Sequence, residues 1–127
     1  MKLLTPIIIF LSVILSSATC NKANTSAKCY KGRLEIKGLC MNYVIKVLDG
    51  NTSALNMAKT WVDESTDKTY ENVFALGNRC NFPDIAEGEE FYFIIDENAK
   101  KDCNVCMAYR PVPKEANSIA VMKTACK

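Results

Sequence analysis

Residues 30–37 read YKGRLEIK, a stretch in which charged and apolar side chains alternate. Leu34 and Ile36 fall on one face of such a segment, and the charged side chains fall largely on the other. A period of two residues is typical of a β-strand with one buried face. The stretch therefore predicts a half-buried strand and a β-sheet that turns one side toward a core.

The sequence that follows predicts further strands and one helix. Residues 40–48 are rich in β-branched side chains and end at Asp49-Gly50, a strong turn signal, so they predict a second strand. Residues 53–62 have apolar side chains at helical spacing behind Ser53, a favourable N-cap, and predict a short helix. The remaining strands are expected at residues 69–76, 91–95, 106–109 and 118–123.

Five or six short strands with one helix predict a mainly β domain over residues 29–127. We expect a small antiparallel barrel, closed or nearly closed and stapled by disulfides. The order of the elements resembles an OB-like barrel. Metalloproteinase-inhibitor and netrin-like modules share that barrel, but they open with a Cys-x-Cys motif that this chain lacks. The resemblance therefore implies a fold and no particular activity.

The first nineteen residues differ from the rest of the chain. Lys2 precedes an apolar run of about a dozen residues, and the small residues 16–19 follow it, which is the pattern of a signal peptide. The run is shorter than the roughly 20 apolar residues that a membrane-spanning helix needs. We therefore expect residues 1–19 to direct export and to be removed.

The segment LSSATC, residues 15–20, resembles the signal of bacterial lipoproteins, in which small residues precede a cysteine that receives the lipid. Thr19 and Ser17 depart from the residues that are usual there. The resemblance, to the small cysteine-containing lipoproteins of bacteria, implies that Cys20 is the lipid attachment site. A cut near Ala18 or after Cys20, without lipid, is the alternative and would give a soluble secreted protein.

Residues 20–28 form a polar stretch of the kind that tethers a lipoprotein domain to its membrane. The residue after the lipidated cysteine would be Asn21, where Asp commonly retains lipoproteins in the inner membrane. The resemblance thus implies a location in the bacterial outer membrane, facing the periplasm.

The chain has seven cysteines, and exported proteins normally pair theirs, so an odd one needs another role. A lipid on Cys20 leaves six for disulfides: Cys29, Cys40, Cys80, Cys103, Cys106 and Cys126. Cys40 opens the second predicted strand and Cys80 follows the third, so Cys40–Cys80 is the best single pair if those strands are antiparallel neighbours. One of Cys103 and Cys106 is then expected to meet Cys126, and the other Cys29. Six cysteines allow 15 pairings, and the sequence leaves the rest of the choice open.

Residues 103–106 read Cys-Asn-Val-Cys, which allows two other interpretations. A Cys-x-x-Cys pair can exchange disulfides when its first thiol lies at a helix N-terminus, but here a proline, Pro111, follows closely and no helix is predicted. A four-cysteine zinc site would need a second such motif. Export favours disulfides over free thiolates, so we expect structural bridges, with thiol oxidoreductase chemistry as an alternative.

The absence of histidine excludes Ser-His-Asp and Cys-His catalysis and histidine-based metal centres. A formal net charge of +2 argues against a nucleic-acid partner. Two groups of carboxylates lie in polar, loop-like surroundings, where we expect them to be solvated: Asp63, Glu64 and Asp67, and Glu87, Glu89 and Glu90. No metal or cofactor is predicted. We expect a non-enzymatic, lipid-anchored binding or structural module of the envelope, or alternatively a secreted inhibitor-like or ligand-binding barrel.

Overall fold

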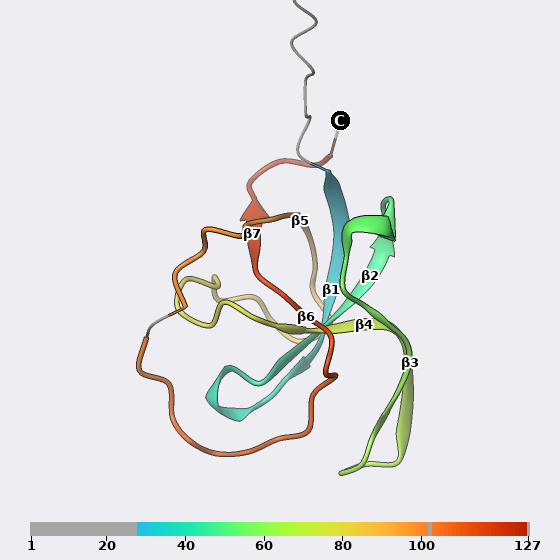
Figure 1. Cartoon of the computed structure of the whole chain (residues 1–127), viewed down its shortest axis with the longest axis vertical. Helices are drawn as coiled ribbons and strands as arrows, with labels where there is room; N and C mark the ends of the chain where they lie inside the picture. The colour runs from blue at the N-terminus through green and yellow to red at the C-terminus, as the bar shows by residue number, and fades with distance from the viewer. Residues whose placement is uncertain (1–27, 102, 127) are drawn as a thin grey trace, which may run out of the picture.

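The computed structural model describes residues 28–101 and 103–126 (Figure 1). The predicted signal peptide, Cys20 and the tether up to residue 27 lie outside these residues. Seven strands form one sheet: β1 (Cys29–Lys37), β2 (Tyr43–Asp49), β3 (Ala58–Asp63), β4 (Lys68–Leu76), β5 (Glu90–Ile95), β6 (Ala116–Asn117) and β7 (Ile119–Met122). The helices among them are single 3-10 turns, η1 (Leu39–Met41) and η2 (Thr52–Ala54), and none in the described ranges is long and apolar enough to cross a membrane.

The sheet is mainly antiparallel, with neighbours in the order β3-β4-β2-β1-β5-β7. The strand predicted from the alternating stretch, β1, lies in the middle and pairs with β2 along one edge and β5 along the other. The turn expected at Asp49-Gly50 follows β2, and Gly50 has a positive φ of 123° that favours glycine. The predicted mainly β, disulfide-stapled class is confirmed.

The sheet is rolled, and its flanks meet only over a short bridge. β6 and β7 are successive parts of one segment separated by Ser118: β7 pairs with β5, whereas β6 pairs in parallel with β4 at two positions, Ala75↔Ala116 and Leu76↔Asn117. Pro113 lies just before β6, and a proline cannot donate a ladder hydrogen bond. The sheet is therefore a partly open roll, and the closed form of the expected barrel is not present.

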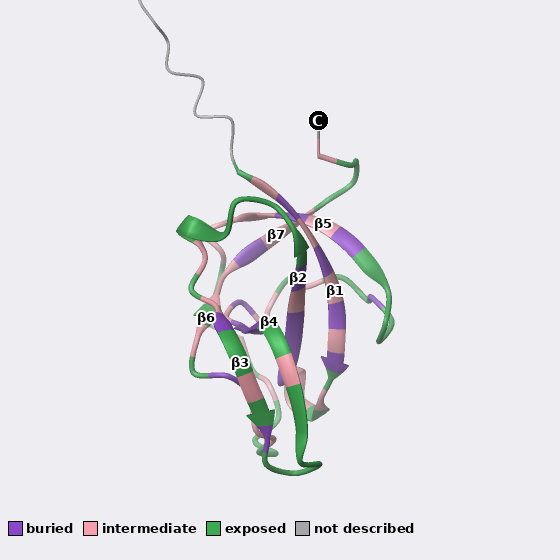
Figure 2. Ribbon diagram, turned by 90° about the vertical axis from the view of Figure 1, so that its right-hand side faces the viewer, coloured by how far each residue is buried: buried purple, intermediate pink, exposed green. Residues whose placement is uncertain are grey.

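The core fills the inside of this roll (Figure 2). Tyr30, Phe74 and Phe93 are fully buried, and the ring of Phe93 lies 5.2 Å from that of Tyr30 and 5.7 Å from that of Phe74. A smaller cluster, made of Ile36, Val44, Ala58 and Val73, lies next to the β3–β4 hairpin. Figure 2 shows the outer part of this hairpin as mostly exposed, so it extends beyond the packed core.

Two elements were predicted wrongly. Residues 53–62 do not form a helix: η2 ends at Ala54 and β3 begins at Ala58, because Thr60, Trp61 and Val62 are β-branched or aromatic and pair with β4. Residues 106–109 do not form a strand; the disulfides nearby and the two prolines that follow hold them in an irregular loop.

Candidate functional site

The most unusual part of the molecule is a loop of residues 103–113, here called the stapled loop. It has no regular secondary structure, yet two of the three disulfides of the described domain attach to its first four residues. They are Cys80–Cys103 and Cys40–Cys106, with Cα–Cα distances of 5.4 and 4.9 Å. The third bridge, Cys29–Cys126, joins the two ends of the described domain. Figure 1 places the stapled loop at the end of the molecule opposite to these termini.

The use of six cysteines in bridges is confirmed, but the predicted pairing is wrong. β2 and β4 are neighbours as assumed, but Cys40 lies in η1, before β2, with a left-handed φ of 56°. Cys40 therefore bonds Cys106, and Cys80 bonds Cys103. Cys126 pairs with Cys29 instead of with Cys103 or Cys106, because β5 holds β7 beside the start of β1.

The Cys-x-x-Cys motif therefore does not act as one dithiol pair, since its two sulfurs belong to different bridges. The six cysteines of the domain are all bonded, which also removes the thiolates that a zinc site would use. Among the described residues, no group of three or more histidine, cysteine or acidic side chains is arranged to hold a metal.

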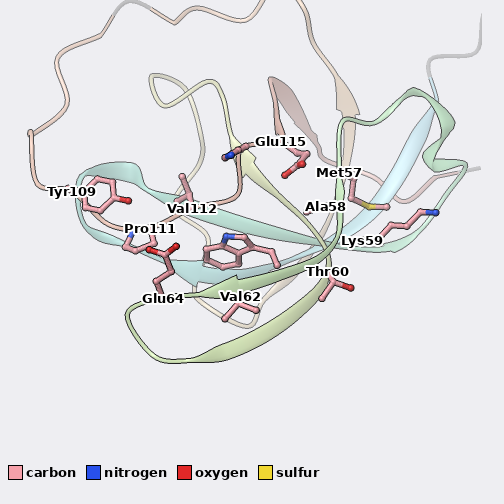
Figure 3. A pocket seen from close by; sticks show the side chains of 12 residues that line it. Met57, Ala58, Lys59, Thr60, Val62, Glu64, Tyr109, Pro111, Val112 and Glu115 are labelled. Atoms are coloured by element: carbon pink, nitrogen blue, oxygen red, sulfur yellow. The ribbon is translucent and has the colours of Figure 1, made fainter.

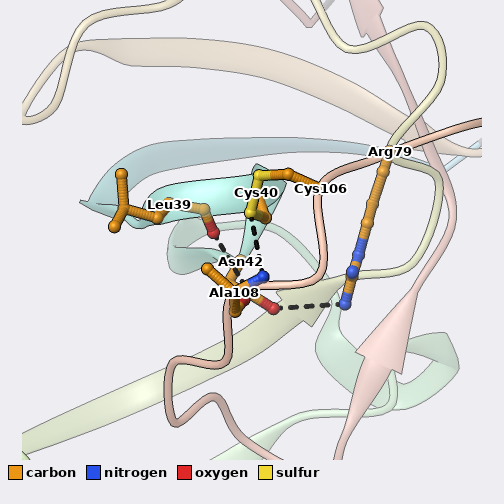
Figure 4. Close-up of a disulfide and its surroundings, with 6 residues drawn as sticks. All are labelled: Leu39, Cys40, Asn42, Arg79, Cys106 and Ala108. Atoms are coloured by element: carbon orange, nitrogen blue, oxygen red, sulfur yellow. Dashed lines mark hydrogen bonds between the residues drawn. A yellow bond between two sulfur atoms is a disulfide. The ribbon is translucent and has the colours of Figure 1, made fainter.

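A buried amide ties the stapled loop to η1 (Figure 4). The side-chain N–H groups of Asn42 donate to the carbonyls of Leu39 and Ala108, at 2.8 and 3.0 Å, and its oxygen accepts from Arg79 at 3.3 Å. The backbone N–H of Ala108 lies 3.2 Å from the sulfur of Cys40. Because a buried amide with satisfied partners resists displacement, the loop and η1 form one rigid unit around the disulfide.

A buried ion pair ties the other part of the loop to the β3–β4 hairpin. The guanidinium of Arg110 donates to Asp63 at 3.0 Å, and the Asp63 side chain is fully buried. Burial acts to raise the pKa of Asp63, but hydrogen bonds from Ser65, the charge of Arg110 and a hydrogen bond from Thr66 outweigh it and lower that pKa. Asp63 is thus an ionised anchor, and the expectation that it is solvated is wrong.

These links hold three apolar side chains out in solvent: Leu39, Met107 and Tyr109, here called the apolar tip. Their exposed fractions are 74%, 95% and 87%, far above those of the other large hydrophobic residues in the described ranges. Their backbones are fixed by the Cys40–Cys106 bridge and by Asn42 and Arg110. Exposed apolar side chains on a backbone that is held in place are suited to contact with another macromolecule, because that backbone has little conformational entropy left to lose.

A groove of about 700 Å³, here called the β3 groove, lies beside the apolar tip (Figure 3). One wall is the stretch from Met57 to Val62, with Glu64 at its end, and the other is the segment from Tyr109 to Glu115. Trp61, in the first wall, is partly buried, and it packs together with Tyr70 and with Val112 of the other wall against the smaller core cluster. The lining of the groove therefore combines apolar side chains with four charged ones, Lys59, Glu64, Lys114 and Glu115.

The second predicted group of carboxylates, Glu87, Glu89 and Glu90, contributes links within the fold. Glu90 pairs with Lys31 at 2.8 Å, Glu87 accepts from the backbone N–H of Lys37, and Glu89 accepts from that of Ala86. Each of these three carboxylates therefore has a different partner.

Comparison with known proteins gives no match to a family model, to a curated protein or to a solved structure. The interpretation of the site therefore rests on its own geometry.

The sequence analysis named the four cysteines and Asp63, but it missed five further residues of this site: Leu39, Asn42, Met107, Tyr109 and Arg110. Arg110 and Asp63 are 47 positions apart, and their pairing depends on the fold. One signal was available: two cysteines and two prolines within residues 103–113 predict a loop that is constrained without being a strand.

Proposed function

We propose that the protein is a non-enzymatic, lipid-anchored binding module of a bacterial envelope, which recognises a protein partner through the apolar tip. The observation that carries the proposal is the apolar tip itself, in which Met107 is 95% exposed on a loop fixed by two disulfides. Groups of exposed apolar side chains are typical of protein–protein interaction sites. An aromatic and a flexible methionine are also side chains typical of interfaces.

The placement of the two ends supports this proposal. Residue 28 leaves the domain at the end that carries the Cys29–Cys126 bridge, away from the stapled loop (Figure 1). Residues 20–28 can reach at most about 30 Å when fully extended. A domain anchored through Cys20 would therefore direct the apolar tip away from its own membrane, toward a partner.

The anchor is tested by labelling cells with radioactive palmitate. We expect the wild-type protein to incorporate label and to fractionate with membranes, and the Cys20→Ser variant to lose both properties. An unmodified mature N-terminus in the wild type, found by mass spectrometry, would favour instead a secreted inhibitor-like domain that presents the same loop.

The binding surface is tested by placing a photoreactive benzoylphenylalanine at position 107 in the intact cell. We expect one discrete cross-linked product, which a Leu39→Ser substitution in the same protein abolishes. The matched control carries the photoreactive group at Glu97, an exposed residue that follows β5 near the termini. Equal cross-linking from both positions would contradict the proposal.

A further inference from the structure

The β3 groove runs along a free backbone edge. β3 is the first strand in the order of the sheet, and among the described residues it pairs with β4 alone. Residues 57–62 line the groove without a gap. Because successive side chains of a strand point to opposite faces, a groove lined by consecutive residues includes the edge of the strand as well as the face that carries Trp61.

An edge strand offers unpaired N–H and C=O groups to an incoming strand. Here the segment from Tyr109 to Glu115 forms the opposite wall of the groove, so an added strand would lie between that wall and β3. The wall is fixed at one end by the ion pair of Arg110 with Asp63 and at the other by the hydrogen bond from Ala75 N–H to the Glu115 carbonyl, at 2.8 Å. Because both walls are held in place, an added strand would not have to organise them.

The charges at the ends of the groove give it a direction. Glu64 is exposed at the C-terminal end of β3, beside Pro111 and Tyr109, and Lys59 is exposed toward the other end (Figure 3). The opposite wall adds Lys114 and Glu115 at that other end, so the two basic side chains there outnumber the one acidic side chain. Neither Glu64 nor Lys59 forms a salt bridge within the described ranges. A bound segment could therefore place a basic side chain beside Glu64 and an acidic one beside Lys59, with apolar side chains over Trp61 between them.

We propose that the β3 groove binds an extended segment of a partner protein, which adds to the free edge of β3 as an antiparallel strand. The segment has a basic residue near its N-terminal end, an apolar centre and an acidic residue near its C-terminal end. The six residues of β3 span about 20 Å at the usual rise of a strand, so about six residues of the partner would pair. An antiparallel strand continues the mode in which β3 already pairs with β4.

This inference rests on the proposed function, because it gives the chemistry of the protein partner. A single peptide strand fits the groove better than a second copy of this chain. The second copy would bring its own β4 and its own segment 109–115 to the same channel, which already has two walls.

The test begins with a displayed library of random seven-residue peptides, selected against the purified exported protein. We expect enriched peptides to alternate apolar and polar residues, with a basic residue in the N-terminal half. The strongest peptide is then synthesised twice, once unmodified and once with alternate backbone nitrogens methylated. Methylation keeps the side chains but removes the N–H donors, and we expect it to weaken binding by about tenfold or more.

The site is located by two further measurements. Hydrogen exchange should slow at residues 58–63 when the peptide binds, and Glu64→Lys should weaken binding by about tenfold, whereas Glu97→Lys, the same change at an exposed site away from the groove, should not. A double variant, Lys59→Glu with Glu64→Lys, should prefer a peptide with its two end charges exchanged.

Four outcomes would overturn the inference: no enrichment, equal binding of the methylated peptide, protection at β7 instead of β3, or a dimer in sedimentation whose β3 amides are protected without peptide. Cross-linking from position 107 that persists in any of these cases would leave the proposed function intact. If the protein binds peptide but takes up no palmitate, the proposal for the β3 groove would stand and the proposal of a lipid anchor would be wrong.

Discussion

The aromatic core and the stapled loop show two ways of holding a polypeptide in place. In the core, Tyr30, Phe74 and Phe93 are fully buried, and removing apolar area from water supplies the stability. In the stapled loop, Met107 and Tyr109 are almost fully exposed, and two disulfides, Asn42 and the Arg110–Asp63 pair supply the order. This fold therefore uses covalent and polar links where large apolar side chains remain exposed and cannot contribute through burial.

The largest expected effect is the loss of a core ring. Phe93→Ala removes the ring that stacks on Tyr30 and contacts Phe74, and we expect the free energy of unfolding to fall by about 3–5 kcal/mol. Urea unfolding measures it. The matched control is Met107→Ala, which we expect to change that free energy by less than about 0.5 kcal/mol. Similar losses of unfolding free energy in the two variants would show that the exposed Met107 contributes as much to stability as a ring of the core.

The next prediction compares the disulfide Cys40–Cys106, which holds the stapled loop, with the disulfide Cys29–Cys126 at the other end of the domain. Replacing Cys40 and Cys106 together by serine should lower the free energy of unfolding by about 2–4 kcal/mol. It should also speed hydrogen exchange at residues 106–110, because the covalent link of the loop to η1 is gone.

The control for that variant is the double replacement of Cys29 and Cys126. We expect a loss of unfolding free energy of the same order, with exchange in residues 106–110 unchanged, since this bridge lies at the other end of the domain. Faster exchange of the stapled loop in both variants would show that the loop depends on global stability and is not held locally.

The same contrast explains what the sequence could predict. The strands of the core were found because they carry a local signal: alternation in residues 30–37, β-branched runs in residues 40–48, and an aromatic run in residues 91–95. Burial on one face imposes a period of two on the sequence, and that period can be detected without knowing the fold.

The site carried no such signal. β3 was predicted as helix because apolar residues at helical spacing also occur in a hairpin that packs little of its surface. The disulfide pairs depended on η1, where Cys40 and Met41 both adopt a left-handed backbone that nothing local predicts for these residue types. Links between distant residues determine the site, and their partners become visible only in three dimensions.

A smaller effect concerns acid stability. The pKa of Asp63 is lowered in the folded state, so its contribution is complete above its ordinary value of about 3.9 and is lost as the pH falls through the folded value. We expect Asp63→Asn to cost about 1–3 kcal/mol at neutral pH, because Arg110 loses its charged partner.

As the pH falls below about 4 toward the lowered pKa of Asp63, the difference in unfolding free energy between the two proteins should shrink, which unfolding curves at several pH values measure. The pKa values of Asp84 and Glu90 are also lowered, by Lys37 and Lys31, but these pairs are on the surface. Measuring in high salt screens them and leaves the buried pair. A pH dependence that is the same in both proteins would show that Asp63 is not the anchor of the loop.

The smallest effect on stability should come from Tyr109→Ala, and this makes it the sharpest test of the contrast. Its side chain is 87% exposed, so we expect the free energy of unfolding to change by less than about 0.5 kcal/mol. The same substitution removes an aromatic anchor from the apolar tip and from one wall of the β3 groove, so cross-linking from position 107 should fall strongly. If Tyr109→Ala lowered the free energy of unfolding as a core substitution does, Tyr109 would contribute to the fold in spite of its exposure. If the substitution lowers only the cross-linking, the exposed ring serves contact with the partner and not the stability of the fold.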